Sequence, residues 1–115
     1  MIDFNKEIVA ALKTILPTYH ELKLTQGTKT PCISYQELSN IAEESGDTLE
    51  YSRISFTIKV WGTDLAVLNA TAGEIDKKMR TLGFTRTGGG GEMYDRNSPM
   101  IQKILIYEAK ALETI

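Results

Sequence analysis

The sequence predicts an α+β domain in which an antiparallel or mixed β-sheet carries two main helices packed on one face. Residues 53–60 alternate between polar and apolar side chains, which is typical of a strand with one buried face. Residues 65–82 repeat apolar side chains at steps of three and four, which is typical of an amphipathic helix. A second, shorter helical repeat precedes Pro17, and further strand-like segments lie on both sides of the longer helix.

The first third of the chain predicts a helix followed by two strands. Asp3 is placed to cap the helix, and Pro17 prevents the helix from continuing. The expected elements are a helix with apolar positions between Phe4 and Ile15, a short strand from Tyr19 to Leu24, a turn from Gly27 to Pro31 and a strand from Cys32 to Leu38.

The next segment, Asn40 to Glu50, is polar and acidic and contains no basic residue. Gly46-Asp47 lies near its middle, and this dipeptide is common in turns. We therefore expect an exposed loop or a long hairpin tip that joins two strands. Its carboxylates are Glu43, Glu44, Asp47 and Glu50.

A strand that leads directly into a helix occupies the centre of the chain. One strand face is apolar and the other is polar, Trp61-Gly62 ends the strand, and Thr63 or Asp64 is placed to cap the helix. Gly83 is expected to end the helix. The predicted core positions are Ile54, Phe56, Ile58 and Val60 from the strand, with Leu65, Leu68, Ala72, Ile75, Met79 and Leu82 from the helix.

The last third predicts two short strands, Phe84–Thr87 and Glu92–Tyr94, around the four glycines Gly88–Gly91. Consecutive glycines are costly to order, so we expect them to form a flexible hairpin tip. A final strand runs from Met100 to Ala109. Its centre is apolar on both faces, which suggests that both faces are covered, one of them by another chain.

Size and composition favour one soluble domain over residues 1–115. The net charge of −2 argues against general affinity for nucleic acid, and no apolar run is long enough to span a bilayer. The start of the chain lacks the pattern of a signal peptide. The single cysteine excludes an internal disulfide.

The residues that usually perform chemistry are few. His20 is the only histidine and Cys32 the only cysteine, so neither a zinc site of the usual composition nor a catalytic triad is predicted. Gly88–Gly91 precede a strand-like segment and lack the Lys-Ser/Thr of a phosphate-binding loop. We therefore predict that the protein is not an enzyme and has no catalytic, cofactor-binding or metal-binding residues. A small ligand-binding module that uses the glycine segment remains an alternative.

The strand Arg53-Ile54-Ser55-Phe56-Thr57-Ile58-Lys59-Val60-Trp61 and its immediate turn into a helix resemble the tail-completion, or tail terminator, proteins of long-tailed bacteriophages. The order of elements from Asp3 to Lys110 resembles that family as well. The resemblance implies a structural, non-catalytic protein of a phage or prophage. Such a protein forms a homohexameric ring that caps the head-proximal end of the tail tube and joins tail to head.

The resemblance also implies partners and a location. The partners are further copies of the chain, the tail tube protein and the head connector or neck proteins, while DNA passes through without specific binding and no membrane is involved. The location is the tail–head junction of the virion, and the bacterial cytoplasm during assembly. A different neck or minor tail protein, such as a head-closure factor, is the alternative within the same class.

Two sets of contact residues are expected from this reasoning. The acidic segment with Glu43, Glu44, Asp47 and Glu50 is a candidate lumen or ring-face element. The candidate subunit or partner contacts are Arg53, Lys59, Trp61, Gly88, Gly89, Gly90, Gly91, Ile101, Leu105 and Tyr107.

Overall fold

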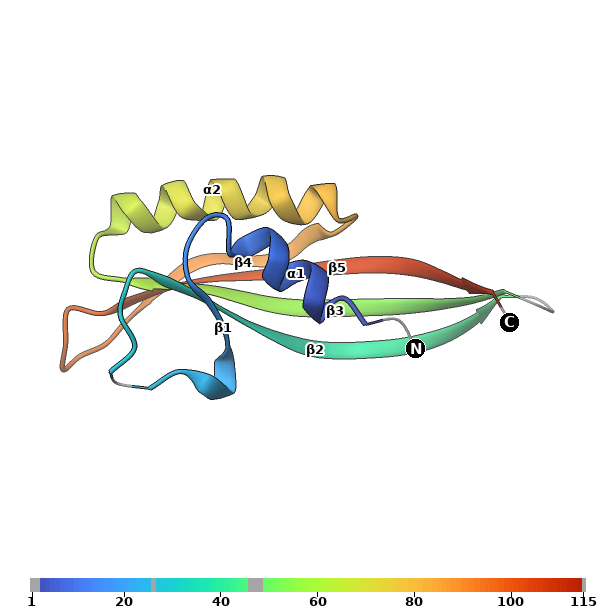
Figure 1. The fold of residues 1–115 in the computed structure, drawn as a ribbon, viewed down its shortest axis with the longest axis horizontal. Coiled ribbons are helices and arrows are strands. Elements are labelled where there is room, and N and C mark those ends of the chain that lie inside the picture. Colours follow the sequence, from blue (N-terminus) through green and yellow to red (C-terminus); the bar gives the residue numbers. More distant parts are fainter. Residues whose placement is uncertain (1–2, 26, 46–48, 115) are drawn as a thin grey trace.

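The computed structural model confirms the α+β class: a five-stranded mixed sheet carries both helices on one side (Figure 1). It describes residues 3–25, 27–45 and 49–114, without the side chains of residues 44, 45, 49, 50 and 112–114. The strand order is β1-β2-β3-β5-β4. β1 runs parallel to β2, and the other neighbouring strands are antiparallel.

Three strands of the sheet are much longer than the other two. β2 (Cys32–Ser45), β3 (Leu49–Gly62) and β5 (Ile101–Thr114) each have 14 residues. The outer strands are β1 (Thr18–His20) and β4 (Thr85–Tyr94). The helices are α1 (Asn5–Leu12) and α2 (Leu65–Thr81), and a 3-10 turn, η1 (Glu21–Lys23), follows β1.

α1 begins where Asp3 supplies an acceptor. The Asp3 Oδ1 atom accepts a hydrogen bond from the Asn5 backbone N–H at 2.9 Å, which satisfies one donor of the first turn. This bond lowers the pKa of the Asp3 carboxyl. The helix buries Ile8 and Leu12 and ends at Leu12, earlier than the apolar repeat predicts.

α2 forms as the sequence predicts. Asp64 caps it by accepting the Ala66 N–H at 3.0 Å, and Gly83 follows its end with a φ of +93°. Leu68, Ile75 and Met79 are fully buried against the sheet. The facing strand side chains, Ile54, Phe56, Ile58 and Val60, are also fully buried. The predicted core is thus confirmed, except that Leu65 and Leu82 are only partly buried.

The sheet extends well beyond the helices. β2, β3 and β5 continue past the ends of α1 and α2 as a three-stranded arm (Figure 1), and the molecule measures 54 × 26 × 24 Å. Of the two alternatives predicted for residues 40–50, the exposed loop is wrong in the described part, and the long hairpin that joins two strands agrees with the structure. Residues 40–45 and 49–50 belong to β2 and β3, because the two strands remain paired up to Ser45 and Leu49.

The glycine segment also differs from its prediction. Gly88–Gly91 lie inside the single strand β4 and do not form a hairpin tip. β4 pairs with β5 from Thr85 to Tyr94, with register shifts between Arg86 and Gly88 and between Gly89 and Glu92. These bulges accommodate the extra residues, and the β-sheet partner overrides the low strand propensity of glycine.

We expect Phe56→Ala to lower the free energy of unfolding by about 3–5 kcal/mol, because the fully buried ring leaves a cavity beneath α2. The ring also packs edge-on against Phe84, with ring centroids 5.8 Å apart. Urea denaturation followed by circular dichroism measures the loss. Ser55→Ala, on the opposite strand face, is the control and should change stability by less than about 0.5 kcal/mol. Equal losses for the two variants would contradict this description of the core.

Candidate assembly surface

One face of the sheet lies opposite the helices, and we call it the open face. Alternation along β3 places Arg53, Lys59 and Trp61 on this face, since Ile54 to Val60 point to the helices. Lys59 lies level with Ile104 of β5, whose side chain is partly exposed on the same face. Ile106 is also partly exposed there, next to Thr57. The open face thus combines charged, aromatic and aliphatic side chains.

Ion pairs link the strands of the arm across the open face. Arg53 pairs with Glu43 on β2 and, through Nε, with Glu108 on β5 at 3.7 Å. The Lys110 Nζ atom lies 3.8 Å from Glu43 and 5.5 Å from the centre of the Tyr51 ring. Each exposed pair contributes about 0–1 kcal/mol, so the pairs fix side-chain positions more than they stabilise the fold.

These ion pairs change the expected charge of the acidic segment, residues 40–50. Glu43 contacts two cations that the sequence of residues 40–50 does not contain. The described carboxylate therefore belongs to a charge-balanced surface. Glu44 and Glu50 face each other in the backbone register, but their side chains lie outside the described residues, as does all of Asp47.

Trp61 is held in place where the open face ends near the β4–β5 turn. Its Nε1–H donates to the Ser34 hydroxyl at 2.9 Å, and Lys59 Nζ lies 5.8 Å from the ring centre. Lys59 is itself paired with Glu21 of η1 at 2.5 Å. A pocket of about 550 Å³ adjoins the ring, and it is lined by Leu24, Thr25, Thr28, Thr30, Asp95, Ser98 and Met100. The Trp61 ring is thus held in a fixed position at one side of a pocket with both polar and apolar lining residues.

The predicted contacts on β5 face the opposite direction. Ile101, Leu105 and Tyr107 point to the helices and are 7%, 1% and 1% exposed. They are core residues, and a partner cannot reach them without opening the fold, which corrects their assignment as contacts. The outward apolar pair on this strand is Ile104 and Ile106.

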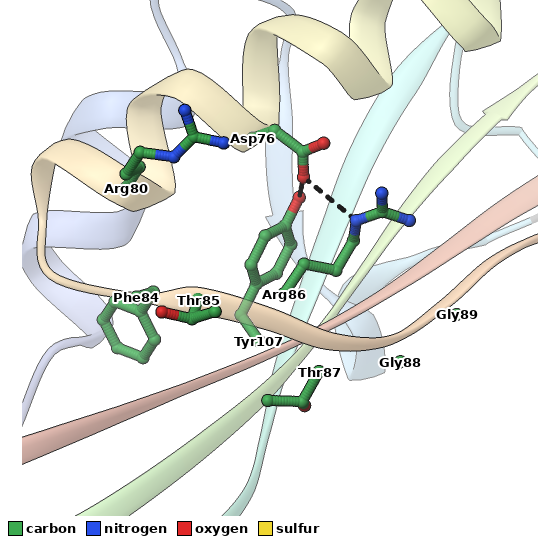
Figure 2. A pocket seen from close by; sticks show the side chains of 9 residues that line it. All are labelled: Asp76, Arg80, Phe84, Thr85, Arg86, Thr87, Gly88, Gly89 and Tyr107. Carbon is green, nitrogen blue, oxygen red and sulfur yellow. Dashed lines mark hydrogen bonds and ion pairs between the residues drawn. The ribbon is translucent and has the colours of Figure 1, made fainter.

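Tyr107 anchors a polar cluster beneath α2 (Figure 2). Its hydroxyl donates to Asp76 Oδ1 at 2.5 Å, and Arg86 Nε lies 3.4 Å from the same oxygen. The cluster lies in a pocket of about 420 Å³, which Arg80, Gly88 and Gly89 also line. Burial, followed by the bond to Asp76 and its negative charge, raises the pKa of Tyr107 far above its ordinary value of 10.0. The cluster ties α2, β4 and β5 together.

Two of the glycines have conformations that explain their presence. Gly89 has a φ of +78°, and a Cβ there would lie 2.4 Å from the carbonyl oxygen of Ile104. Gly90 has a φ of +93°, and a Cβ there would lie 2.6 Å from a terminal nitrogen of Arg86. The segment therefore permits close approach of β4 to β5 and of Arg86 to the strand. It does not feed a helix N-terminus, which a phosphate-binding loop requires.

His20 and Cys32, the single histidine and the single cysteine, both have structural positions. His20 Nδ1 accepts the Leu22 N–H at 3.1 Å, and its ring packs edge-on against Tyr35. Cys32 is 1% exposed, and burial raises the pKa of its thiol. Within residues 3–25, 27–45 and 49–114, no group of three His, Cys, Asp or Glu side chains is arranged to hold a metal ion. No helix in the same ranges has the length and apolar character needed to cross a membrane.

The structure thus brings three of the predicted contacts together and separates the others. Arg53, Lys59 and Trp61 share the open face, whereas the glycines belong to the edge strand β4. Sequence reasoning missed Ile104 and Ile106 as the outward pair, although alternation from the buried core would have placed them once the inward face was known. It also missed the Asp76–Arg86–Tyr107 cluster, which joins three separate elements.

Comparison with known proteins adds no relative: no protein-family model matches the chain, and no curated protein matches it either. Its function is therefore inferred from the residues and geometry of the chain.

We expect Gly89→Ala to lower the free energy of unfolding by roughly 2–4 kcal/mol, because the new Cβ meets a backbone carbonyl and the positive φ disfavours alanine. Thermal or urea denaturation measures the change. Gly91→Ala is the matched control: its Cβ would have no neighbour within 4 Å, and we expect a change within about 1 kcal/mol. A Gly89→Ala protein as stable as Gly91→Ala would exclude the close approach of β4 to β5.

Tyr107 makes stability depend on alkaline pH. Its folded-state pKa is raised, so its contribution to stability is fully present below the ordinary value of 10.0 and is lost as pH rises above it. We expect the unfolding free energy to fall by up to about 1.4 kcal/mol per pH unit above pH 10 through this one group. Tyr107→Phe should flatten this slope, while Tyr94→Phe, at an exposed position, should not. Urea titrations at several pH values give both slopes, and identical slopes for wild type and Tyr107→Phe would contradict the assignment.

Proposed function

We propose that the protein is a structural component of a phage or prophage tail, which assembles with copies of itself into a ring at the head-proximal end of the tail tube. The observation that carries the proposal is the arm. Three long strands project past the core with one face open and without an evident catalytic group among the described residues. A sheet extended in this way provides area for contacts between subunits and can form the wall of a ring. A small enzyme requires neither.

The open face has the composition of a contact surface. Ile104 and Ile106 supply apolar area, and Trp61 supplies a fixed aromatic side chain next to a hollow. Aromatic and aliphatic residues in such positions are typical anchors of protein interfaces. The paired charges around Arg53 lie beside this area, further along the arm.

Charge balance also agrees with the passage of DNA through the ring. Affinity for DNA comes largely from Lys and Arg that are free to contact phosphates. On the arm, Arg53 and Lys110 are both engaged by carboxylates. A lumen built from such pairs would not retain DNA, even though it is not the purely negative surface that the acidic segment suggested.

The same features serve a head-closure factor or another neck protein equally well, and the partner decides between these roles. A terminator binds the tail tube protein, and a head-closure factor binds the connector. The gene order of the source genome separates them, because a tail tube gene directly downstream favours the terminator.

Light scattering of the purified protein, alone and mixed with tail tube protein, tests the ring. We expect a species of fixed stoichiometry with several times the monomer mass of 12.8 kDa. A strict monomer at every concentration, both with and without the tube protein, contradicts the proposal.

Tail length in a complementation assay tests the capping role. We expect Ile104→Asp combined with Ile106→Asp to remove capping, because two charges replace the outward apolar pair of β5. Electron microscopy should then show tubes longer than those of wild type. Val67→Asp on the exposed face of α2 is the control and should leave tube length unchanged. Circular dichroism must show that both variants are folded, and normal tube lengths with a folded double variant would rule out this face as the contact.

A further inference from the structure

The sheet has two long edges that no described strand of the same chain covers. On one side, β1 pairs with β2 only from Ile33 to Tyr35, so among the described residues no strand pairs with the segment 36–45 of β2 on the side away from β3. On the other side, β4 is the last strand, and all of its residues from Thr85 to Tyr94 lie at the border of the sheet. An uncovered edge presents main-chain donors and acceptors that can pair with another strand.

Both edges also expose apolar side chains. Leu38 and Ile41 on β2 are 52% and 54% exposed, and Met93 and Tyr94 on β4 are 56% and 64% exposed. The described residues include seven exposed large apolar side chains, and four of the seven lie on these two edges. A partner that covers the edges would therefore bury side chains as well as complete the main-chain pairing.

The two edges match in length and direction. β4 has 10 residues, and the uncovered part of β2, residues 36–45, is equally long. Successive antiparallel pairs make β2 and β5 run one way and β3 and β4 the other. When a second copy is placed beside the first with its open face on the same side, its β4 therefore meets β2 in the antiparallel sense.

The offset between the edges gives the geometry of the assembly. Within one copy, Gly89 is level with Leu105, then Ile58, then Tyr35. When β4 of a second copy is aligned with residues 36–45 of β2, it lies about five residues further along β2 than β4 of the same copy does. At the usual rise per residue this shift is ~17 Å. The four strands from β2 to β4 span about 19 Å across. The strands would then tilt by about 40°, within the range of closed barrels.

We infer that copies of this chain join through antiparallel pairing of β4 of one copy with residues 36–45 of β2 in the next, so that their sheets form one continuous barrel. The contact joins two different surfaces, and such head-to-tail contacts close into rings when the rotation permits. β1 limits the pairing, because it already occupies β2 up to Tyr35. The bulges in β4 make its edge uneven, so the pairing is defined by segments and not by single residues. This inference rests on the proposed ring and specifies the surfaces that build it.

A cross-link between the two edges tests the inference on the whole chain. Gln36→Cys and Met93→Cys place thiols on the open face, at the ends of segment 36–45 and of β4 that would meet. At least three strand spacings, or ~14 Å, separate them within one copy, so a short bismaleimide joins different copies. We expect a ladder of covalent oligomers on a denaturing gel. Gln36→Cys with Val67→Cys on α2, and the wild type with its buried Cys32, are the controls and should remain monomeric.

Light scattering of the same samples distinguishes a failure of the edge pairing from a failure of the proposed ring. A ring that yields the ladder supports both. A ring without the ladder overturns the edge pairing and leaves the ring in place, while a monomer under all conditions overturns the ring itself. As a second test, Ile41→Lys places a charge on the free edge of β2 and should weaken association about tenfold, whereas Val67→Lys should not. Equal association of these two variants would also overturn the pairing.

Discussion

The burial of one face of β3 against α2 is the interaction on which the rest of the molecule depends. Ile54, Phe56, Ile58 and Val60 are fully buried in one core cluster with Leu68, Ile75 and Met79 of α2. β3 is also the middle strand of the sheet, with β2 on one side and β5 on the other. Once this face is packed, the opposite face of the whole sheet must point away from the helices, and the charged and aromatic residues of β3 are displayed there.

The helices are shorter than the strands they cover, and this difference in length creates the arm. α2 has 17 residues, which span about 25 Å as a helix, whereas a 14-residue strand spans about 46 Å. The sheet therefore outruns its cover and continues as the arm. Within the arm, charged side chains of β2, β3 and β5 pair with one another across the strands, which fixes their positions on the open face.

The sequence predicts well those features that depend on neighbours along the chain. The alternation over β3 and the repeat over α2 are local, and so are Asp64 and Gly83 at the helix ends. The glycine segment was mistaken for a tip because its strand conformation comes from pairing with β5, which no local pattern reveals. The inward face of β5 was misjudged because Ile104, Leu105 and Ile106 are all apolar, so alternation gives no direction. The Asp76–Tyr107 contact joins residues 31 positions apart and was not predictable for the same reason.

The position of β5 has a consequence for the order in which the molecule forms. β5 follows β4 in the chain, yet it lies between β3 and β4 in the sheet. During synthesis β4 therefore has no strand beside it until β5 has left the ribosome, so the β4 edge of the proposed contact forms after the β2 edge. Contacts between distant segments form slowly, which lengthens this interval. If copies pair as proposed, each copy completes the β2 side of the contact first and the β4 side last, because β4 depends on β5 for its place in the sheet.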